Sequence, residues 1–199
     1  ARAGRGGALA IGGHAGLGKS RLKWEATRLA GAMGFACHEG RAPAFAGTAF
    51  GALADLLTEA LGVGRDASTA QCRAALRRRL RELRLAPRDG LALARVLGAP
   101  GSPDTNVGKV DLLDTFLAVR AFLAALARER PRLFVLEDMH WADELTRDAV
   151  SSLDGHLASS RAVLLLLHRP EYAPPPGVDR IVLHELAEES VERMLDALL

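Results

Sequence analysis

The chain has 199 residues, of which 49% are hydrophobic and 25% charged, and its formal net charge is +2. At this length and composition we expect one soluble α/β domain with a substantial core, and the small net charge does not by itself indicate an acidic or basic partner. The longest strongly apolar run, residues 162–167, is far too short to span a bilayer, and residues 1–7 lack the apolar core of a signal peptide. Cys37 and Cys72 lie far apart without metal-ligand spacing, which favours two free thiols in a reducing cytoplasm.

In chain order, short apolar runs alternate with segments of helical periodicity. This pattern predicts strands over residues 8–11, 34–40, 132–136, 162–167 and 178–184. It predicts helices over 21–30, 49–61, 69–85, 88–97, 109–130 and 190–199, a further helix capped by Asp143, and loops at 41–48 and 98–103. The runs 132–136 and 162–167 are continuously apolar, which is typical of parallel strands covered on both faces. The alternation indicates a three-layer α/β fold.

The segment after the first predicted strand fits the pattern G-x-x-x-x-G-K-[ST], which forms a phosphate-binding loop (P-loop) between a strand and a helix. Glycines let the backbone curl so that successive N–H groups point at phosphate oxygens, and the following helix adds the positive end of its dipole. The alternative is a glycine-rich turn that contains Lys-Ser by chance, and the flanking strand and helix argue against it. The nucleotide-binding residues predicted here are Gly13, His14, Ala15, Gly16, Leu17, Gly18, Lys19, Ser20 and Arg21.

Two side chains of this loop have specific chemical roles. Lys19 would reach the β- and γ-phosphates of a nucleotide, and the Ser20 hydroxyl would hold Mg²⁺. His14 lies in the variable part of the pattern and needs no catalytic role. We therefore predict ATP and Mg²⁺ as the cofactors.

A second site element is the acidic pair Glu137-Asp138, which directly follows the predicted strand 132–136. The carboxyl ends of parallel strands are where α/β proteins bind ligands, so both carboxylates would lie at the nucleotide edge of the sheet. One can hold Mg²⁺, usually through water, and the other can orient or deprotonate an attacking water. Alone, such a pair indicates only a solvated strand end, but downstream of a P-loop it is the expected partner.

Three segments together carry a resemblance to a known family: Gly13–Leu22 (GHAGLGKSRL), Phe134–Asp143 (FVLEDMHWAD) and Leu164–Glu171 (LLLLHRPE). They resemble the STAND branch of AAA+-related P-loop ATPases. More narrowly, they are similar to the origin-recognition-complex-like ATPase domain of LuxR-type transcriptional regulators and of proteins associated with soluble adenylyl cyclases. The resemblance covers nearly the whole chain, but residues 60–108 match only in being helical.

The resemblance implies a parallel five-stranded sheet in the order 5-1-4-3-2, with the strand ending at His168 between the P-loop strand and the strand that carries the acids. It implies an ATPase core over residues 1–187, a helical insertion at about 49–130, and the start of a truncated helical lid at 188–199. It places Glu137 at the metal-associated (Walker B) position, Asp138 next to it, and Arg169 as the sensor that contacts the γ-phosphate. The family order is Asp then Glu, so the reversed pair leaves open which acid is the base. Arg169 could instead be a surface arginine before Pro170, and Trp141 is better explained by packing than by ligand binding.

An arginine-rich predicted helix offers a nucleic-acid interpretation, with Arg73, Arg77, Arg78, Arg79, Arg81 and Arg84. It has no interleaved aromatic residues, and Leu76, Leu80 and Leu83 form an ordinary buried face. We therefore expect a solvated helix and no direct binding of nucleic acid by this domain.

Together these features predict a Mg-ATP-binding regulatory switch in a signalling protein, with slow hydrolysis and a covalently linked output domain. One alternative is an active AAA+ ATPase that acts on DNA or another macromolecule, which would need an arginine finger and homo-oligomerisation. Another is a P-loop kinase, which would need a basic lid and an acceptor site. The separate strand that carries the acids and the sensor-like Arg169 argue against the kinase.

Overall fold

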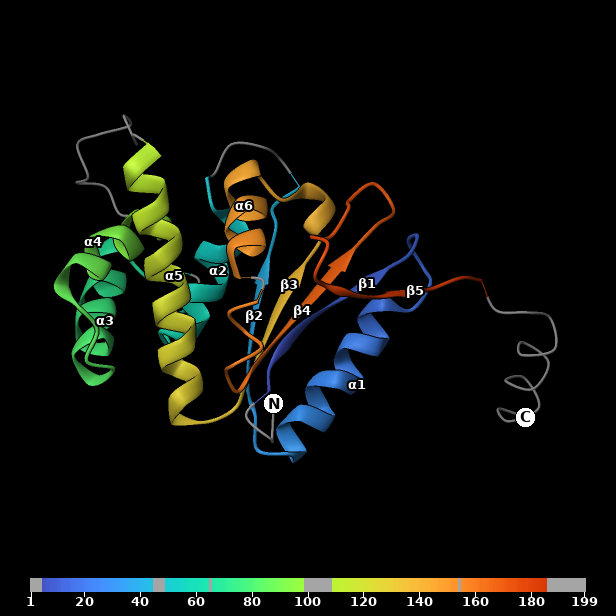
Figure 1. The fold of residues 1–199 in the computed structure, drawn as a ribbon, viewed down its shortest axis with the longest axis horizontal. Coiled ribbons are helices and arrows are strands. Elements are labelled where there is room, and N and C mark those ends of the chain that lie inside the picture. Colours follow the sequence, from blue (N-terminus) through green and yellow to red (C-terminus); the bar gives the residue numbers. More distant parts are fainter. Residues whose placement is uncertain (1–4, 45–48, 65, 99–108, 154, 186–199) are drawn as a thin grey trace.

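The computed structural model describes residues 5–44, 49–64, 66–98, 109–153 and 155–185, with backbone only at 109–111. Its centre is a five-stranded parallel sheet in the order β2-β3-β4-β1-β5 (Figure 1). The strands are β1 (Gly7–Gly12), β2 (Ala36–Arg41), β3 (Arg132–Glu137), β4 (Ala162–His168) and β5 (Asp179–Val182). This confirms the predicted fold class and the predicted order 5-1-4-3-2, with β4 between β1 and β3.

Six α-helices and a short 3₁₀ turn occupy the described residues. They are α1 (Lys19–Ala32), α2 (Gly51–Ala60), α3 (Thr69–Glu82), α4 (Pro87–Val96), α5 (Lys109–Glu129), the turn η1 (Met139–Trp141) and α6 (Glu144–Leu153). Each corresponds to a predicted helix within a few residues, apart from η1. The predicted helix 190–199 and the turn after Gly98 lie outside the described residues. In the part of the chain that the structure describes, no helix combines the length and the apolar character needed to cross a membrane.

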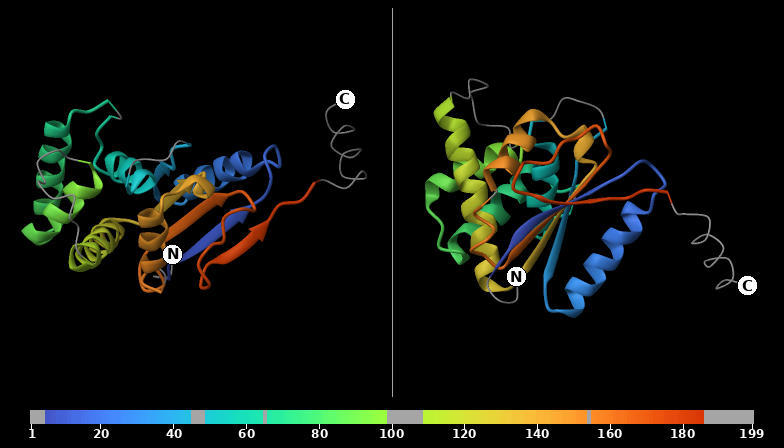
Figure 2. Two further views of the ribbon diagram at one scale, coloured as in Figure 1. Left: turned by 90° about the horizontal axis from the view of Figure 1, so that it is seen from above. Right: turned by 45° about the vertical axis from the view of Figure 1, so that its right-hand side comes forward.

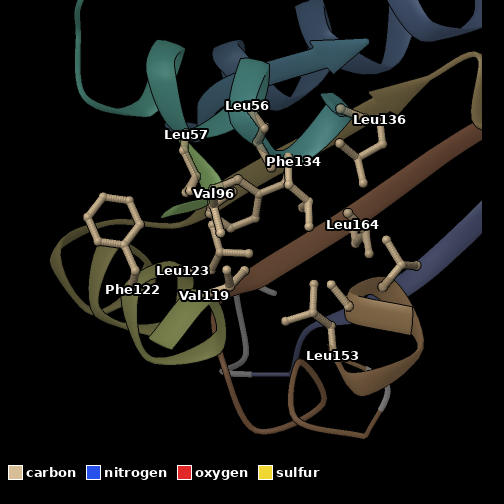
Figure 3. Packing of buried hydrophobic residues seen from close by; sticks show 14 of the residues in the cluster. Leu56, Leu57, Val96, Val119, Phe122, Leu123, Phe134, Leu136, Leu153 and Leu164 are labelled. Atoms are coloured by element: carbon tan, nitrogen blue, oxygen red, sulfur yellow. The ribbon is translucent and has the colours of Figure 1, made fainter. Parts of the chain in front are cut away.

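The two faces of the sheet bury separate apolar clusters because side chains alternate along each strand. On one face, Phe134, Leu136 and Leu164 pack against α2, α5 and α6 (Figure 3). On the other face, Ile11, Leu133, Val135, Leu165 and Leu167 pack against α1. Both central strands are therefore covered on both sides, as their continuous apolar runs predict.

Helix α1 is more exposed than its leucines predict. Ala26 and Ala30 pack against the sheet, but Leu22 and Leu29 are 38% and 52% exposed. The small alanine side chains leave only a narrow contact surface, so the flanking leucines remain in solvent. Strand β5 is also shorter than expected and all four of its residues are exposed, because it forms an edge of the sheet.

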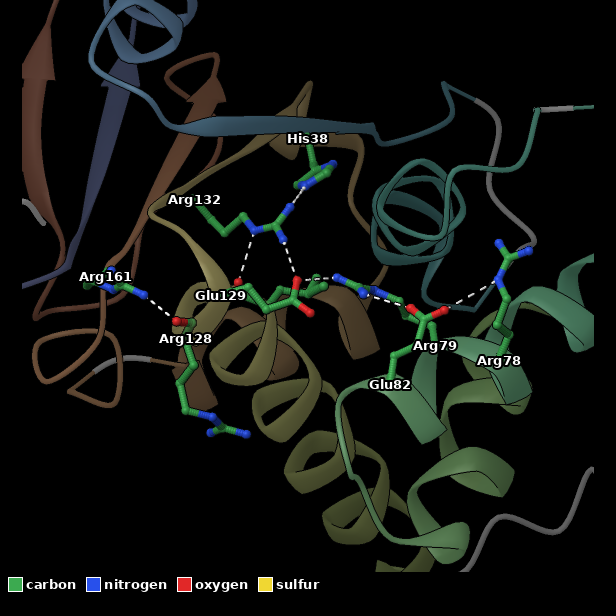
Figure 4. Close-up of polar contacts among 9 residues, drawn as sticks. His38, Arg78, Arg79, Glu82, Arg128, Glu129, Arg132 and Arg161 are labelled. Carbon is green, nitrogen blue, oxygen red and sulfur yellow. Dashed lines mark hydrogen bonds and ion pairs between the residues drawn. The ribbon is translucent and has the colours of Figure 1, made fainter.

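Helices α3 and α4 lie on the far side of α5 from the sheet (Figure 2). Leu76, Leu80 and Leu83 of the arginine-rich segment are buried, as predicted for the inner face of this helix. A polar network ties α3 to the sheet through Arg132, which is only 5% exposed although it is charged (Figure 4). Arg132 Nη2 donates to Glu129 Oε2 at 3.1 Å, and the same carboxylate oxygen accepts a bond from Arg79 of α3.

The second guanidinium nitrogen of Arg132 bonds to His38 of β2. Arg132 Nη1 lies 2.8 Å from His38 Nε2, and because arginine can only donate, this ring nitrogen must be the acceptor. Burial and then Arg132 lower the pKa of His38 to about 4. His38 is therefore neutral at physiological pH, and α3, α5, β2 and β3 are joined by one network.

Candidate functional site

The P-loop begins directly after β1, at Gly13, and ends at Ser20, the second residue of α1. Gly16 and Gly18 both have φ of 85°, a left-handed conformation that favours glycine. Gly18 is also the N-cap of α1, where no side chain caps the helix and no acidic residue occupies the first turn. The first N–H groups of a 14-residue helix therefore face the loop without a protein acceptor from the cap, which suits an anionic ligand.

Lys19 lies against the loop that precedes it. Its Nζ donates to the carbonyl oxygens of Gly13 and His14, each at 2.6 Å. Burial lowers the pKa of Lys19, the nearby Arg169 guanidinium lowers it further, and the carboxylates of Asp138 and Glu171 partly offset this. The structure thus places Asp138 and Arg169 within electrostatic range of the loop lysine.

The two predicted acids have different environments. Glu137 ends β3 and is 8% exposed, and its Oε1 lies 3.0 Å from Lys23 Nζ and 3.3 Å from Arg41 Nη2. Asp138 has a left-handed backbone with φ of 57°, which turns the chain from β3 into η1. Its side chain is 34% exposed and its Oδ2 lies 3.5 Å from Arg41 Nε. Glu137 is therefore anchored by cations, whereas Asp138 is more accessible.

Arg169 follows β4 at the same edge of the sheet. The backbone N–H of Gly13 donates to the carbonyl of His168 at 3.3 Å, so the start of the P-loop and Arg169 are neighbours. The Arg169 guanidinium lies 5.6 Å from the centre of the Trp141 ring, which is 42% exposed rather than packed in the core. The His140 ring lies against Trp141 with ring centres 4.6 Å apart and the two planes tilted by 44°.

His140 has an unusual environment for a polar side chain. Both of its ring nitrogens are buried, and among the described residues neither has a hydrogen-bond partner. Burial lowers the pKa of His140, and Arg169 lowers it further. The sequence marks this residue only through its motif, and its proximity to Lys19, Arg169 and Glu171 becomes visible only in the fold.

Most of the remaining P-loop residues are accessible to solvent. His14, Ala15, Gly16, Gly18 and Ser20 are exposed, and Leu17 is half-buried. Arg21 is tied to Glu25 at 3.0 Å and lies 4.7 Å from the Trp24 ring centre. Its role in nucleotide binding remains a prediction, because its side chain is engaged on the outer face of α1.

The donor set near the acids fits Mg²⁺ shared with a nucleotide, but not an all-protein metal site. Ser20 offers an exposed hydroxyl at the start of α1, and Asp138 an accessible carboxylate. Across the described residues, no group of three or more His, Cys, Asp or Glu side chains could hold a metal ion. Mg²⁺ prefers oxygen ligands and usually keeps several waters beside one or two carboxylates and substrate phosphates, and this set allows that arrangement.

Comparison with known families decides which kind of P-loop domain this is. The family model described as an AAA ATPase domain matches residues 1–166, from the N-terminus into β4. The chain belongs to this family. Membership makes it a nucleotide-binding ATPase domain, and the matched residues include the P-loop and both acids but not Arg169. A search of curated proteins returned no match.

Two residues that sequence reasoning missed are Lys23 and Arg41, which both bind Glu137. The sequence contains only weak indications of their role. Lys23 lies four residues after Lys19, so it lies on the same side of the helix, and Arg41 lies at the carboxyl end of β2, at the same edge as the P-loop. Neither signal alone distinguishes these residues from solvated surface charges.

Proposed function

We propose that this AAA ATPase domain is a Mg-ATP-binding switch with slow hydrolysis, in a signalling protein of the LuxR-type regulator or adenylyl cyclase-associated kind. The observation that carries the proposal is the grouping of Lys19, Asp138 and Arg169 around one P-loop. A covalently linked output domain would receive the signal. A switch needs a group that interacts differently with ATP and ADP, because a ligand with equal affinity for both states shifts no equilibrium.

In this proposal each side chain has a separate task. The P-loop N–H groups and Lys19 bind the β- and γ-phosphates, replacing the bonds that Lys19 makes to Gly13 and His14. Ser20 and one carboxylate of the pair Glu137-Asp138 would hold Mg²⁺, which supplies charge neutralisation between the phosphates when it is bound. The other carboxylate would orient the attacking water.

Arg169 is the proposed sensor of the γ-phosphate. It follows the strand next to the P-loop strand, and a guanidinium binds phosphate oxygens through paired N–H donors. Its position over Trp141 keeps the side chain near the loop at the edge where the acids lie. An arginine that contacts only the γ-phosphate distinguishes ATP from ADP, which is the property that a switch requires.

The test compares ATPγS and ADP binding by calorimetry for the wild type, Arg169→Ala and Arg28→Ala. Arg28 is an exposed arginine of α1 that pairs with Glu25, so it controls for loss of positive charge. We expect Arg169→Ala to weaken ATPγS at least about tenfold, or roughly 1.4 kcal/mol, and to leave ADP nearly unchanged. Equal losses for both nucleotides, or no loss for either, would remove Arg169 from the proposed sensor role.

A further inference from the structure

Lys23 connects α1, the helix that follows the P-loop, to strands β2 and β3. Its side chain is only 16% exposed, and its Nζ donates to Glu39 Oε2 of β2 at 2.7 Å and to Glu137 Oε1 of β3 at 3.0 Å. Arg41 Nη2 approaches the same Glu137 oxygen at 3.3 Å. Lys23 and Arg41 therefore both contact the same carboxylate oxygen of Glu137, the acid that the family resemblance places at the metal.

These contacts offset the free-energy cost of removing the Glu137 carboxylate from water. The Glu137 side chain is only 10% exposed, so its charge is costly unless it is paired, and Lys23 supplies a positive charge at hydrogen-bond distance. Asp138 differs, because it is 34% exposed and its contact with Arg41 is 3.5 Å long. The two adjacent acids are thus unequal: one is neutralised from within the protein, and the other keeps its charge accessible.

We propose that Lys23 is a positioning residue whose charge holds the carboxylates of Glu137 and Glu39 in place. Asp138 is then the carboxylate that is available to the Mg²⁺ of a Mg-nucleotide. The inference rests on the proposed nucleotide function. It also assigns Glu137 to an anchoring role, because a divalent cation that approached its Oε1 would have to displace Lys23.

The electrostatic consequence has a definite sign. The cluster contains the acids Glu39, Glu137 and Asp138 and the bases Lys23 and Arg41. Removing the Lys23 charge makes this edge more negative, which repels nucleotide phosphates when no metal is present and attracts Mg²⁺ when it is. The ratio of the nucleotide Kd in EDTA to the Kd in Mg²⁺ should therefore increase. A lysine whose charge is screened from the nucleotide site would change stability but not this ratio.

The experiment titrates ATPγS by calorimetry in EDTA and in excess Mg²⁺. The variants are Lys23→Met, the charge-conserving Lys23→Arg, and Arg28→Met as an exposed control on the same helix. We expect the ratio to rise at least about threefold in Lys23→Met, and to stay within twofold of the wild type in Lys23→Arg and Arg28→Met. If Lys23→Met fails to fold, Glu39→Gln supplies the opposite test at a partly exposed side chain, because it makes the cluster less negative and should lower the ratio.

Two failures can be told apart. If the wild type responds to Mg²⁺ but the ratio is unchanged in Lys23→Met, or in Glu39→Gln when that variant is used, the role of Lys23 is overturned and the proposed function stands. If the wild type binds no ATPγS in either condition, the proposed function itself is overturned, and this inference with it.

Discussion

Asp143 joins the starts of two helices, and its replacement should cost more than the loss of an ordinary cap. Its Oδ1 accepts from the N–H groups of Phe50 and Thr146, at 2.9 and 3.0 Å. Its Oδ2 accepts from the N–H of Gly51 at 3.0 Å and from the Thr146 hydroxyl at 2.6 Å. One carboxylate therefore caps both α2 and α6. It also holds Phe50, a bulky residue with φ of 60°, in a conformation that such residues rarely adopt.

The expected loss of stability follows from the hydrogen-bond donors that Asp143→Ala leaves without an acceptor. Two caps are worth roughly 1 kcal/mol each, and the hydroxyl of the fully buried Thr146 loses its acceptor for about 1 kcal/mol more. We expect a loss of about 3 kcal/mol in the free energy of unfolding, which lowers Tm by roughly 6–12 °C in a domain of this size. Asp143→Asn keeps some acceptor capacity and should lose less.

The assay is urea unfolding followed by circular dichroism, with Asp148→Ala as the control because Asp148 is an exposed acid on the same helix. Burial favours the neutral form of Asp143, but the bonds from Thr146, Phe50 and Gly51 outweigh it, so its pKa lies below 3.8. The group therefore stabilises the fold above pH 4 or so, and the difference between wild type and Asp143→Ala should shrink as pH falls below that value. A loss below about 0.5 kcal/mol, equal to that of Asp148→Ala, would refute the double-cap explanation.

Two further predictions concern the network around Arg132. Glu129→Gln should destabilise the fold by about 1–2 kcal/mol, because it leaves the buried Arg132 guanidinium without its counter-charge. Glu82→Gln, at the exposed end of the network, should cost under about 1 kcal/mol. Similar urea midpoints for the two variants would contradict this ranking. His38 has a folded pKa of about 4, below its ordinary 6.5, so the wild type should lose stability as pH falls through that window. His38→Gln should reduce this loss in unfolding experiments at pH 7, 6 and 5, and an unchanged pH dependence would exclude His38 as its source.

Local patterns predicted the fold where one local cause dominates. Strands β3 and β4 were evident because residues covered on both faces must be apolar throughout, and the P-loop because its glycines and its helix are consecutive. The cap of α6 is local too, since Asp143 and Thr146 are three residues apart. Its second half, at Phe50, spans 93 residues and could not be inferred.

The parts of the site that sequence missed depend on contacts between distant elements. Lys23 and Glu137 are 114 residues apart, and their pairing depends on how α1 sits over β3. The exposure of Leu29 likewise depends on how close Ala26 and Ala30 bring α1 to the sheet. No periodicity in the sequence encodes these distances, so the unequal environments of the two acids emerge only from the fold.

The most direct test of the account is calorimetric titration of Mg-ATP into the wild type, Lys19→Ala and Arg28→Ala. Lys19 is the loop cation placed against the P-loop carbonyls, whereas Arg28 is an exposed arginine of α1 that pairs with Glu25. We predict that Lys19→Ala remains folded and loses at least about tenfold in ATP affinity, roughly 1.4 kcal/mol, while Arg28→Ala loses much less. Unchanged ATP binding by a folded Lys19→Ala would contradict the assignment of this loop as the nucleotide site.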